Sequence, residues 1–83
     1  MKVSIKYFAS IREAMGMPGE TLDTEATSLQ ALRDELIARN QAGAQALARG
    51  RAVRLALNQT MSDESAPLTA GAEIAFFPPV TGG

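Results

Sequence analysis

The carboxyl end of the chain is the segment whose residue types could take part in chemistry. Its last six residues are Pro78-Pro79-Val80-Thr81-Gly82-Gly83. Because Gly82 and Gly83 carry no side chain, the terminal carboxylate is unhindered, and the backbone can pass through a channel too narrow for a Cβ. The two prolines favour an extended, polyproline-like backbone, so we expect the tail to leave the folded body. The candidate reacting group is therefore the Gly83 carboxylate.

Most other chemistries are excluded by composition. The 83 residues include no cysteine and no histidine. A thiolate nucleophile, a Ser-His-Asp triad and a typical zinc site are therefore impossible. A chain of this length forms one domain, which leaves no cleft between domains where a pair of carboxylates could be tuned. The sequence predicts a protein that binds no metal or cofactor and is not an enzyme on its own.

The charge and the hydrophobic content of the chain limit the kinds of partner that it is expected to bind. Hydrophobic residues make up 46% of the chain and charged residues 20%, with a formal net charge of -1. This is a globular composition without the positive field that favours nucleic acid or an anionic membrane. The apolar runs are far shorter than the ~20 residues of a membrane span, and the start of the chain does not read as a signal peptide. A cytoplasmic protein is the expectation.

Hydrophobic periodicity predicts two strands before the main helix. Residues 2–7 alternate between polar and apolar side chains, as in a half-buried strand. Residues 9–15 are expected to form a short helical turn that ends at Gly16. Residues 20–25 predict a second, weaker strand, which would suit the edge of a sheet because it is short and polar.

The clearest predicted helix begins after a capping box, with Thr27 as the N-cap and Gln30 reaching back to it. An apolar stripe follows with helical spacing and should lie across a sheet. Its members are Leu29, Leu32, Leu36 and Ile37, and the opposite side is expected to carry Gln30, Arg33, Asp34 and Arg39.

The second half of the chain predicts two more strands. Residues 51–58 alternate, with Val53, Leu55 and Leu57 facing inward, and residues 73–77 form the last strand before the prolines stop it. Residues 42–48 are expected to form a helical turn and residues 59–67 an irregular loop. The order indicates an α+β domain over residues 1–77, in which one main helix packs across one face of a mixed sheet, followed by a flexible tail over residues 78–83.

Several motifs resemble the small subunits of molybdopterin synthase, which are sulfur carriers of the ubiquitin-like β-grasp fold. The resemblance spans nearly the whole chain, and its most specific block is residues 76–83. Residues 40–50 carry none of it, so their role stays open. The other matching motifs are Tyr7-Phe8-Ala9, Arg12-Glu13, Leu29-Gln30-Ala31-Leu32, Leu57-Asn58-Gln59 and Pro67-Leu68.

The resemblance implies a role in molybdenum cofactor biosynthesis. A ubiquitin-activating-like adenylyltransferase would use ATP to adenylate Gly83, and a sulfur donor protein, which the sequence does not identify, would convert it to a thiocarboxylate. The loaded tail would enter the large subunit of the synthase, in a complex of two small and two large subunits. There its sulfur would add to a cyclic pyranopterin monophosphate precursor.

A docking surface can be predicted from the phase of two strands. In a β-grasp sheet the first and last strands are parallel neighbours, so their carboxyl ends lie together. Phe8 and Phe77 occupy those ends and are both out of phase with the inward residues. They would form an exposed apolar patch, extended by Met61, which indicates a partner interface. The alternative is that a neighbouring loop covers both rings.

Two rival functions remain open. One is a carrier or protein modifier of another pathway, such as thiamin synthesis. The other is a non-covalent ubiquitin-like interaction module that never reacts at its C-terminus, because a Gly-Gly end also occurs by chance in roughly one chain in 200. Two further groups are interpreted as plain solvated surface. These are the Arg12-Glu13 pair and a basic cluster of Arg49, Arg51 and Arg54.

Overall fold

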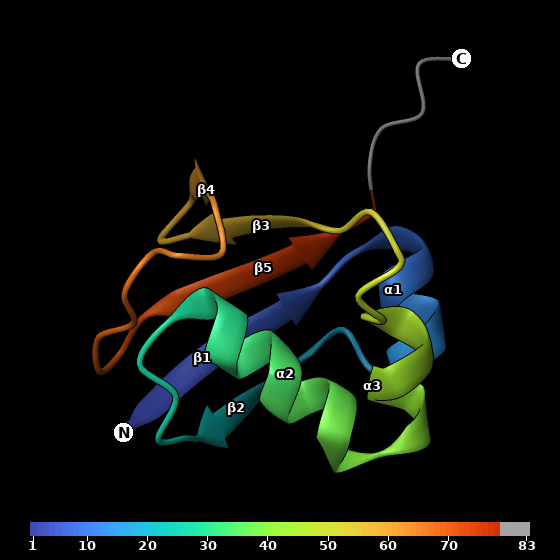
Figure 1. The fold of residues 1–83 in the computed structure, drawn as a ribbon, viewed down its shortest axis with the longest axis horizontal. Coiled ribbons are helices and arrows are strands. Elements are labelled where there is room, and N and C mark those ends of the chain that lie inside the picture. The colour runs from blue at the N-terminus through green and yellow to red at the C-terminus, as the bar shows by residue number, and fades with distance from the viewer. Residues whose placement is uncertain (79–83) are drawn as a thin grey trace.

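The computed structural model describes residues 1–78; the predicted tail residues 79–83 lie outside the described residues. Five strands and three helices are found in the described part of the chain (Figure 1). In chain order they are β1 Lys2–Tyr7, α1 Ala9–Met15, β2 Gly19–Asp23, α2 Leu29–Arg39, α3 Gln41–Ala46, β3 Arg54–Leu57, β4 Thr60–Ser62 and β5 Glu73–Phe77.

The strands form one mixed sheet in the order β2-β1-β5-β3-β4. The first and last strands, β1 and β5, are parallel neighbours, whereas every other neighbouring pair is antiparallel. The short, polar β2 lies at an edge of the sheet, as its composition predicts. The predicted α+β fold with a mixed sheet is therefore confirmed.

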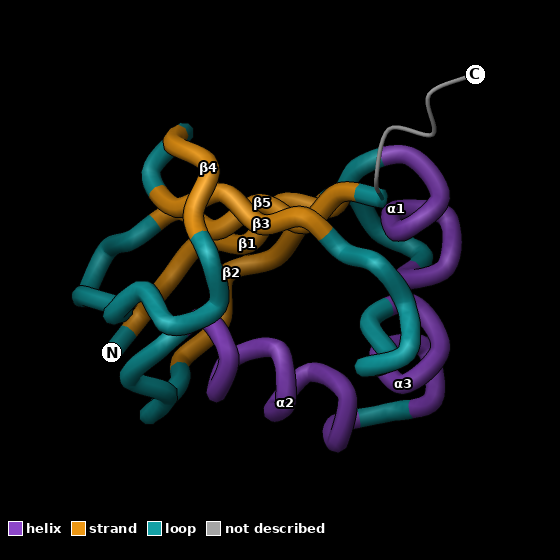
Figure 2. Tube along the Cα trace, turned by 45° about the horizontal axis from the view of Figure 1, so that its top comes forward, coloured by secondary structure: helices purple, strands orange, loops and turns teal. Residues whose placement is uncertain are grey.

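One face of the sheet is covered by helices. Figure 2 shows α2 and α3 on one side of the strands, with α1 at the end of the sheet where β1 and β5 finish. The core between these layers holds the predicted inward residues of β1 and β5 and the apolar stripe of α2. Tyr7 of β1 stacks on Phe76 of β5, with ring centroids 6.1 Å apart. No helix within residues 1–78 is long and apolar enough to cross a membrane.

The start of α2 differs from the prediction by one residue. Ser28, not Thr27, is the N-cap, and its Oγ accepts a hydrogen bond of 3.1 Å from the backbone N–H of Ala31. The carbonyl of Thr27 accepts a 2.9 Å hydrogen bond from Leu68 N–H. Ser28 forms a β-bridge with Pro67 and has the extended backbone of an N-cap, with φ -145° and ψ 163°, so the helix begins at Leu29.

The prediction that residues 59–67 are irregular is wrong at their start. Asn58 and Gln59 have positive φ angles of 50° and 71°, and Leu57 pairs with Thr60 across them. Positive φ at both central residues defines the tight hairpin turn that suits a twisted pair of strands. The Oδ1 of Asn58 also accepts a 3.0 Å hydrogen bond from Glu73 N–H. The turn therefore creates a fifth strand, β4.

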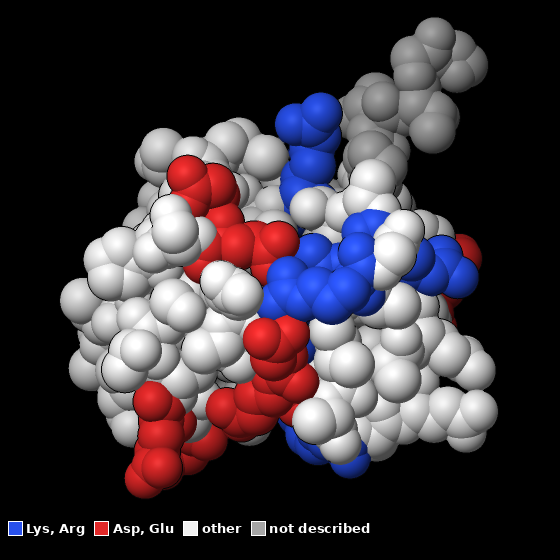
Figure 3. Space-filling model, viewed as in Figure 1, with Lys and Arg blue, Asp and Glu red and all other residues white. Residues whose placement is uncertain are grey.

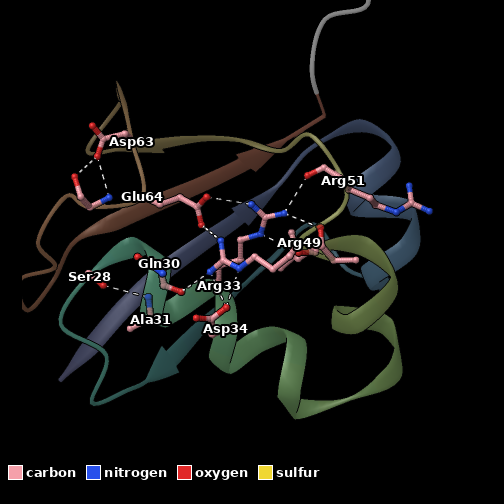
Figure 4. Close-up of polar contacts among 12 residues, drawn as sticks. Ser28, Gln30, Ala31, Arg33, Asp34, Arg49, Arg51, Asp63 and Glu64 are labelled. Carbon is pink, nitrogen blue, oxygen red and sulfur yellow. Dashed lines mark hydrogen bonds and ion pairs between the residues drawn. The ribbon is translucent and has the colours of Figure 1, made fainter.

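Arg33 is the clearest departure from the predicted pattern of α2. Its side chain was expected on the solvent side of the helix, yet the residue is only 3% exposed. In Figure 4 its guanidinium points between α2 and the connection from α3 to β3. There it donates hydrogen bonds to backbone carbonyls, and burial lowers the pKa of the guanidinium. The buried charge is thus tolerated because it is hydrogen bonded.

Candidate functional site

The parallel pairing of β1 and β5 brings their carboxyl ends to one end of the sheet. Phe8 directly follows β1, and its N–H donates a 3.1 Å hydrogen bond to the carbonyl of Phe76 in β5. Phe77 ends β5, and Pro78 follows as the last described residue. The root of the predicted tail therefore lies beside the end of β1.

Phe8 and Phe77 lie side by side on the face of the sheet opposite α2. Their ring centroids are 5.4 Å apart, with the rings tilted by 38°. Phe8 is 43% exposed, and Phe77 is partly buried. The predicted adjacency of the two rings is confirmed, and no described loop buries Phe8. Whether they bind a partner stays a prediction at this point.

Small side chains form a hollow next to the aromatic pair. Ala75 of β5 lies between Lys6 of β1 and Ala56 of β3, and Ala56 is paired with Met61 of β4. Met61 is 54% exposed at the far side of this row. The hollow has a volume of about 320 Å³ and a mainly apolar floor. Its lining is Lys6, Phe8, Ala56, Gln59, Met61, Glu73, Ala75 and Phe77.

The two alanines of this hollow are absent from the sequence-based prediction. They share the phase of the outward residues Phe77 and Arg54 along their strands, but that phase alone does not show that they are paired. The register between β3 and β5 places them together. A run of small residues on neighbouring strands signals a hollow only once this register is known.

Positive charges border the aromatic pair. Arg54 is exposed and is paired in register with Phe77, and Arg12 lines a second hollow together with Phe8. Lys6 is 3.6 Å from Glu73, which partly offsets its charge. On the helix-covered face, by contrast, Lys and Arg side chains gather at the centre beside Asp and Glu side chains (Figure 3). The open face therefore offers an apolar surface with a cationic rim.

The described residues of the site are mainly apolar and cationic. Within residues 1–78, no three His, Cys, Asp or Glu side chains gather as a metal site would require. The other predicted site residues, Pro79, Val80, Thr81, Gly82 and Gly83, lie outside the described residues. The described site is thus an exposed apolar surface that ends where the predicted reactive tail begins.

A mixed sheet with parallel first and last strands and one long helix across one face is the ubiquitin-like β-grasp fold. This class of small domain covers the whole described chain. Within the class, the chain belongs to the ThiS family, which matches residues 5–83.

Individual relatives agree with this assignment. The chain is 38% identical over 81 residues to the molybdopterin synthase sulfur carrier subunit of Escherichia coli, covering 98% of this chain and 99% of that protein. It is similar in structure to one chain of a complex of subunits 1 and 2 of molybdopterin-converting factor from Helicobacter pylori, with a TM-score of 0.70, 27% identity and full coverage of both chains. A small archaeal modifier protein from Haloferax volcanii shares the fold at a TM-score of 0.77 and 24% identity, also with full coverage of both chains.

Proposed function

We propose that this chain is the sulfur carrier subunit of molybdopterin synthase and that Gly83 carries the sulfur. The 38% identity to a sulfur carrier subunit, which extends over nearly the full length of both proteins, supports this function. The observation that carries it in the structure is the exposed Phe8–Phe77 pair at the root of the tail. A carrier needs such an arrangement, because a partner must bind the folded domain while the end of the chain reacts.

The proposed loading reaction has three steps. An oxygen of the Gly83 carboxylate attacks the α-phosphorus of ATP on an activating enzyme, and diphosphate leaves. The terminal sulfur of a persulfide on a donor protein then attacks the acyl carbon and AMP leaves. A thiol cleaves the resulting acyl disulfide, which leaves a thiocarboxylate on Gly83 and a disulfide on the donor. A free carboxylate is a poor electrophile, so adenylation must come first. Catalytic acids and bases belong to the partner enzymes, and this chain supplies the reacting atom.

The proposed unloading reaction takes place in the large subunit of the synthase. Phe8, Phe77 and Met61 dock on that subunit, since exposed aromatic residues and methionine are enriched at protein interfaces. Six residues of extended chain reach at most about 20 Å. The sulfur-accepting precursor must therefore bind within that distance of the docked Phe77. Two such carriers and two large subunits form the complete complex.

The test is the intact mass of the protein after incubation with an activating enzyme, ATP and a sulfur source. A gain equal to the exchange of one oxygen for one sulfur, mapped to Gly83, is the expected result. A variant that lacks Gly83 should keep its circular dichroism spectrum and gain no mass. An unchanged mass of the intact chain, in a reaction where the E. coli carrier is charged, would reject the proposal.

The same truncation separates the carrier from a non-covalent interaction module. A module that binds only through its sheet or helix would keep its function without Gly83, whereas a carrier loses all of it. Charging by one purified activating enzyme rather than another identifies the pathway that the carrier serves.

A further inference from the structure

Arg33 uses its buried guanidinium to hold one segment of backbone. Its Nε donates a 2.8 Å hydrogen bond to the carbonyl of Leu47, and its Nη2 donates to the carbonyls of Ala48 and Arg51 at 2.8 and 3.2 Å. Nη1 lies 3.4 Å from the carboxylate of Glu64. Three carbonyls of the connection between α3 and β3 thus converge on one side chain, as Figure 4 shows.

This connection has no regular secondary structure of its own between α3 and β3. Leu47 is buried at its start, and Arg51 N–H donates a 2.9 Å hydrogen bond to the carbonyl of Ala48. The hydrogen bond to Leu47 is buried and those to Ala48 and Arg51 are partly buried, so loss of the guanidinium donor costs free energy, most of all at Leu47. Arg33 therefore fixes the backbone of residues 47–51 from the helix layer.

The fixed segment leads directly to the root of the tail. Arg54 is paired with Phe77 in the antiparallel β3–β5 ladder, so Val53 comes level with Pro78. A hollow of about 210 Å³ lies at this place. It is lined by Arg51, Ala52 and Val53 of the segment, by Pro78, and by Ser10, Ile11 and Ala46. The side chain of Arg51 extends away from Arg33, while its carbonyl faces the guanidinium (Figure 4).

We propose that Arg33 is a positioning residue for sulfur transfer, because it fixes the wall along which the chain leaves the sheet at Pro78. This inference rests on the function proposed above. A prolyl residue has no N–H, so it cannot continue the ladder to β3, and residues 51–53, which line the same hollow as Pro78, border its path instead. A displacement of about 1 Å at a reacting group can slow a reaction up to about 100-fold.

The proposed role separates docking from transfer. Arg33 belongs to the helix-covered side, whereas Phe8, Phe77 and Met61 lie on the open face of the sheet. Loss of the Arg33 hydrogen bonds should thus leave the grip of a partner on the open face unchanged. The direction in which the chain leaves the sheet should change. This lowers kcat at a saturating concentration of the loaded carrier and leaves the KM for the carrier unchanged.

The experiment compares Arg33→Lys with Arg39→Lys in carriers already loaded with sulfur. Lysine keeps the charge and the long stem but lacks the planar fork that reaches several carbonyls. Arg39 is a matched control because it lies on the same helix but donates its hydrogen bonds to Glu20 of β2, away from the 47–51 segment. With the large subunit and the pyranopterin precursor, Arg33→Lys is expected to lower kcat about tenfold at constant KM. Arg39→Lys is expected to stay within about twofold.

Hydrogen exchange gives a second readout that does not depend on transfer. The amide of Arg51, bonded to Ala48, should exchange faster in Arg33→Lys and at the wild-type rate in Arg39→Lys. An unchanged kcat, an equal loss in both variants, or a loss confined to KM would overturn the inference. If the wild-type chain accepts no sulfur, the proposed function fails instead, and that result is seen before any variant is compared.

Discussion

At the scale of single residues, Glu20 connects three elements of the fold. Its carboxylate accepts two hydrogen bonds from Arg39 at the end of α2, of 2.7 and 2.8 Å. It also accepts a 2.7 Å hydrogen bond from the hydroxyl of Tyr7 in β1. The hydrogen bonds from Arg39 are the main cause that lowers the pKa of Glu20, against the opposing effect of burial. Burial, and then the hydrogen bond to Glu20, raise the pKa of Tyr7.

The lowered pKa of Glu20 predicts a loss of stability in acid. In the unfolded chain this carboxyl titrates near its ordinary value of 4.5, whereas in the folded protein it stays ionised to lower pH. The unfolded state therefore binds the proton first as the pH falls. The stabilisation is complete above the unfolded pKa and disappears as the pH falls through the folded one.

Glu20→Gln should lower the free energy of unfolding at neutral pH by about 1–3 kcal/mol, because hydrogen bonds to a charged group are lost. It should also flatten the fall of that free energy as the pH drops through and below 4.5. Urea denaturation at a series of pH values measures both effects. Glu13→Gln, at an exposed position of α1, is the control and should change neither. A wild-type pH slope in Glu20→Gln would contradict the assignment.

At the scale of elements, the packing of α3 on α2 depends on one glycine. A Cβ added to Gly43 would lie 2.0 Å from the carbonyl oxygen of Leu36, a backbone atom that cannot move aside. Asn40 caps α3 by accepting a 2.9 Å hydrogen bond from the N–H of Gly43. The short helix is thus held close to the end of α2, and only glycine allows this approach.

Gly43→Ala is expected to destabilise the protein by about 2 kcal/mol or more through this overlap. Helix propensity alone predicts the opposite, a gain of about 1 kcal/mol. Gly50→Ala is the matched control, because an added Cβ there meets no described atom within 4 Å. Chemical denaturation of the two variants measures the difference. A Gly43→Ala variant as stable as Gly50→Ala would mean that α2 and α3 separate at no cost.

Sequence patterns predict where the helices and strands of this fold lie better than they predict the residues that depart from those patterns. Alternation and helical spacing locate β1, β5 and α2 because they depend on the chain's own periodicity. Arg33 breaks the pattern because its hydrogen-bond acceptors, the carbonyls of residues 47–51, are assembled only by tertiary structure. Strand β4 has only three residues, and its turn uses Asn58-Gln59 in place of the usual Asn-Gly.

The candidate site is predictable to a similar extent. The outward phase of Phe8 and Phe77 follows from the alternation of their strands, and the pairing of those strands follows from the fold class. The floor of the hollow requires the register among β5, β3 and β4, which no local pattern encodes. The aromatic pair could therefore be foreseen, but the surface that surrounds it could not.

At the scale of the whole molecule, the two faces of the sheet have separate roles. The helix-covered face holds the core, and the open face presents the aromatic pair with its cationic rim. Neighbouring residues of β5 alternate between these faces: Phe76 is fully buried, whereas Phe77 packs on Phe8 at the surface. Substitutions along one strand should therefore affect folding and docking in turn.

Phe77→Ala should weaken binding to the large subunit about tenfold or more, because it removes an aromatic anchor. Its cost in unfolding free energy should be smaller than that of Phe76→Ala, which opens a cavity in the core worth about 3–5 kcal/mol. Titration calorimetry against the large subunit and urea denaturation measure the two quantities. Equal affinity of Phe77→Ala and the wild-type chain would remove the open face from the interface.

The parallel pairing of β1 with β5 has a mechanical consequence. The chain enters β1 at Lys2 and leaves β5 at Phe77, which are at opposite ends of the sheet (Figure 1). A pull on the chain beyond Phe77 therefore acts along the strand axis, and β5 is bonded to a neighbour on each side. Its ladder bonds are loaded together in shear, rather than opened one at a time from an end. The sheet is therefore expected to stay intact when the chain is pulled beyond Phe77.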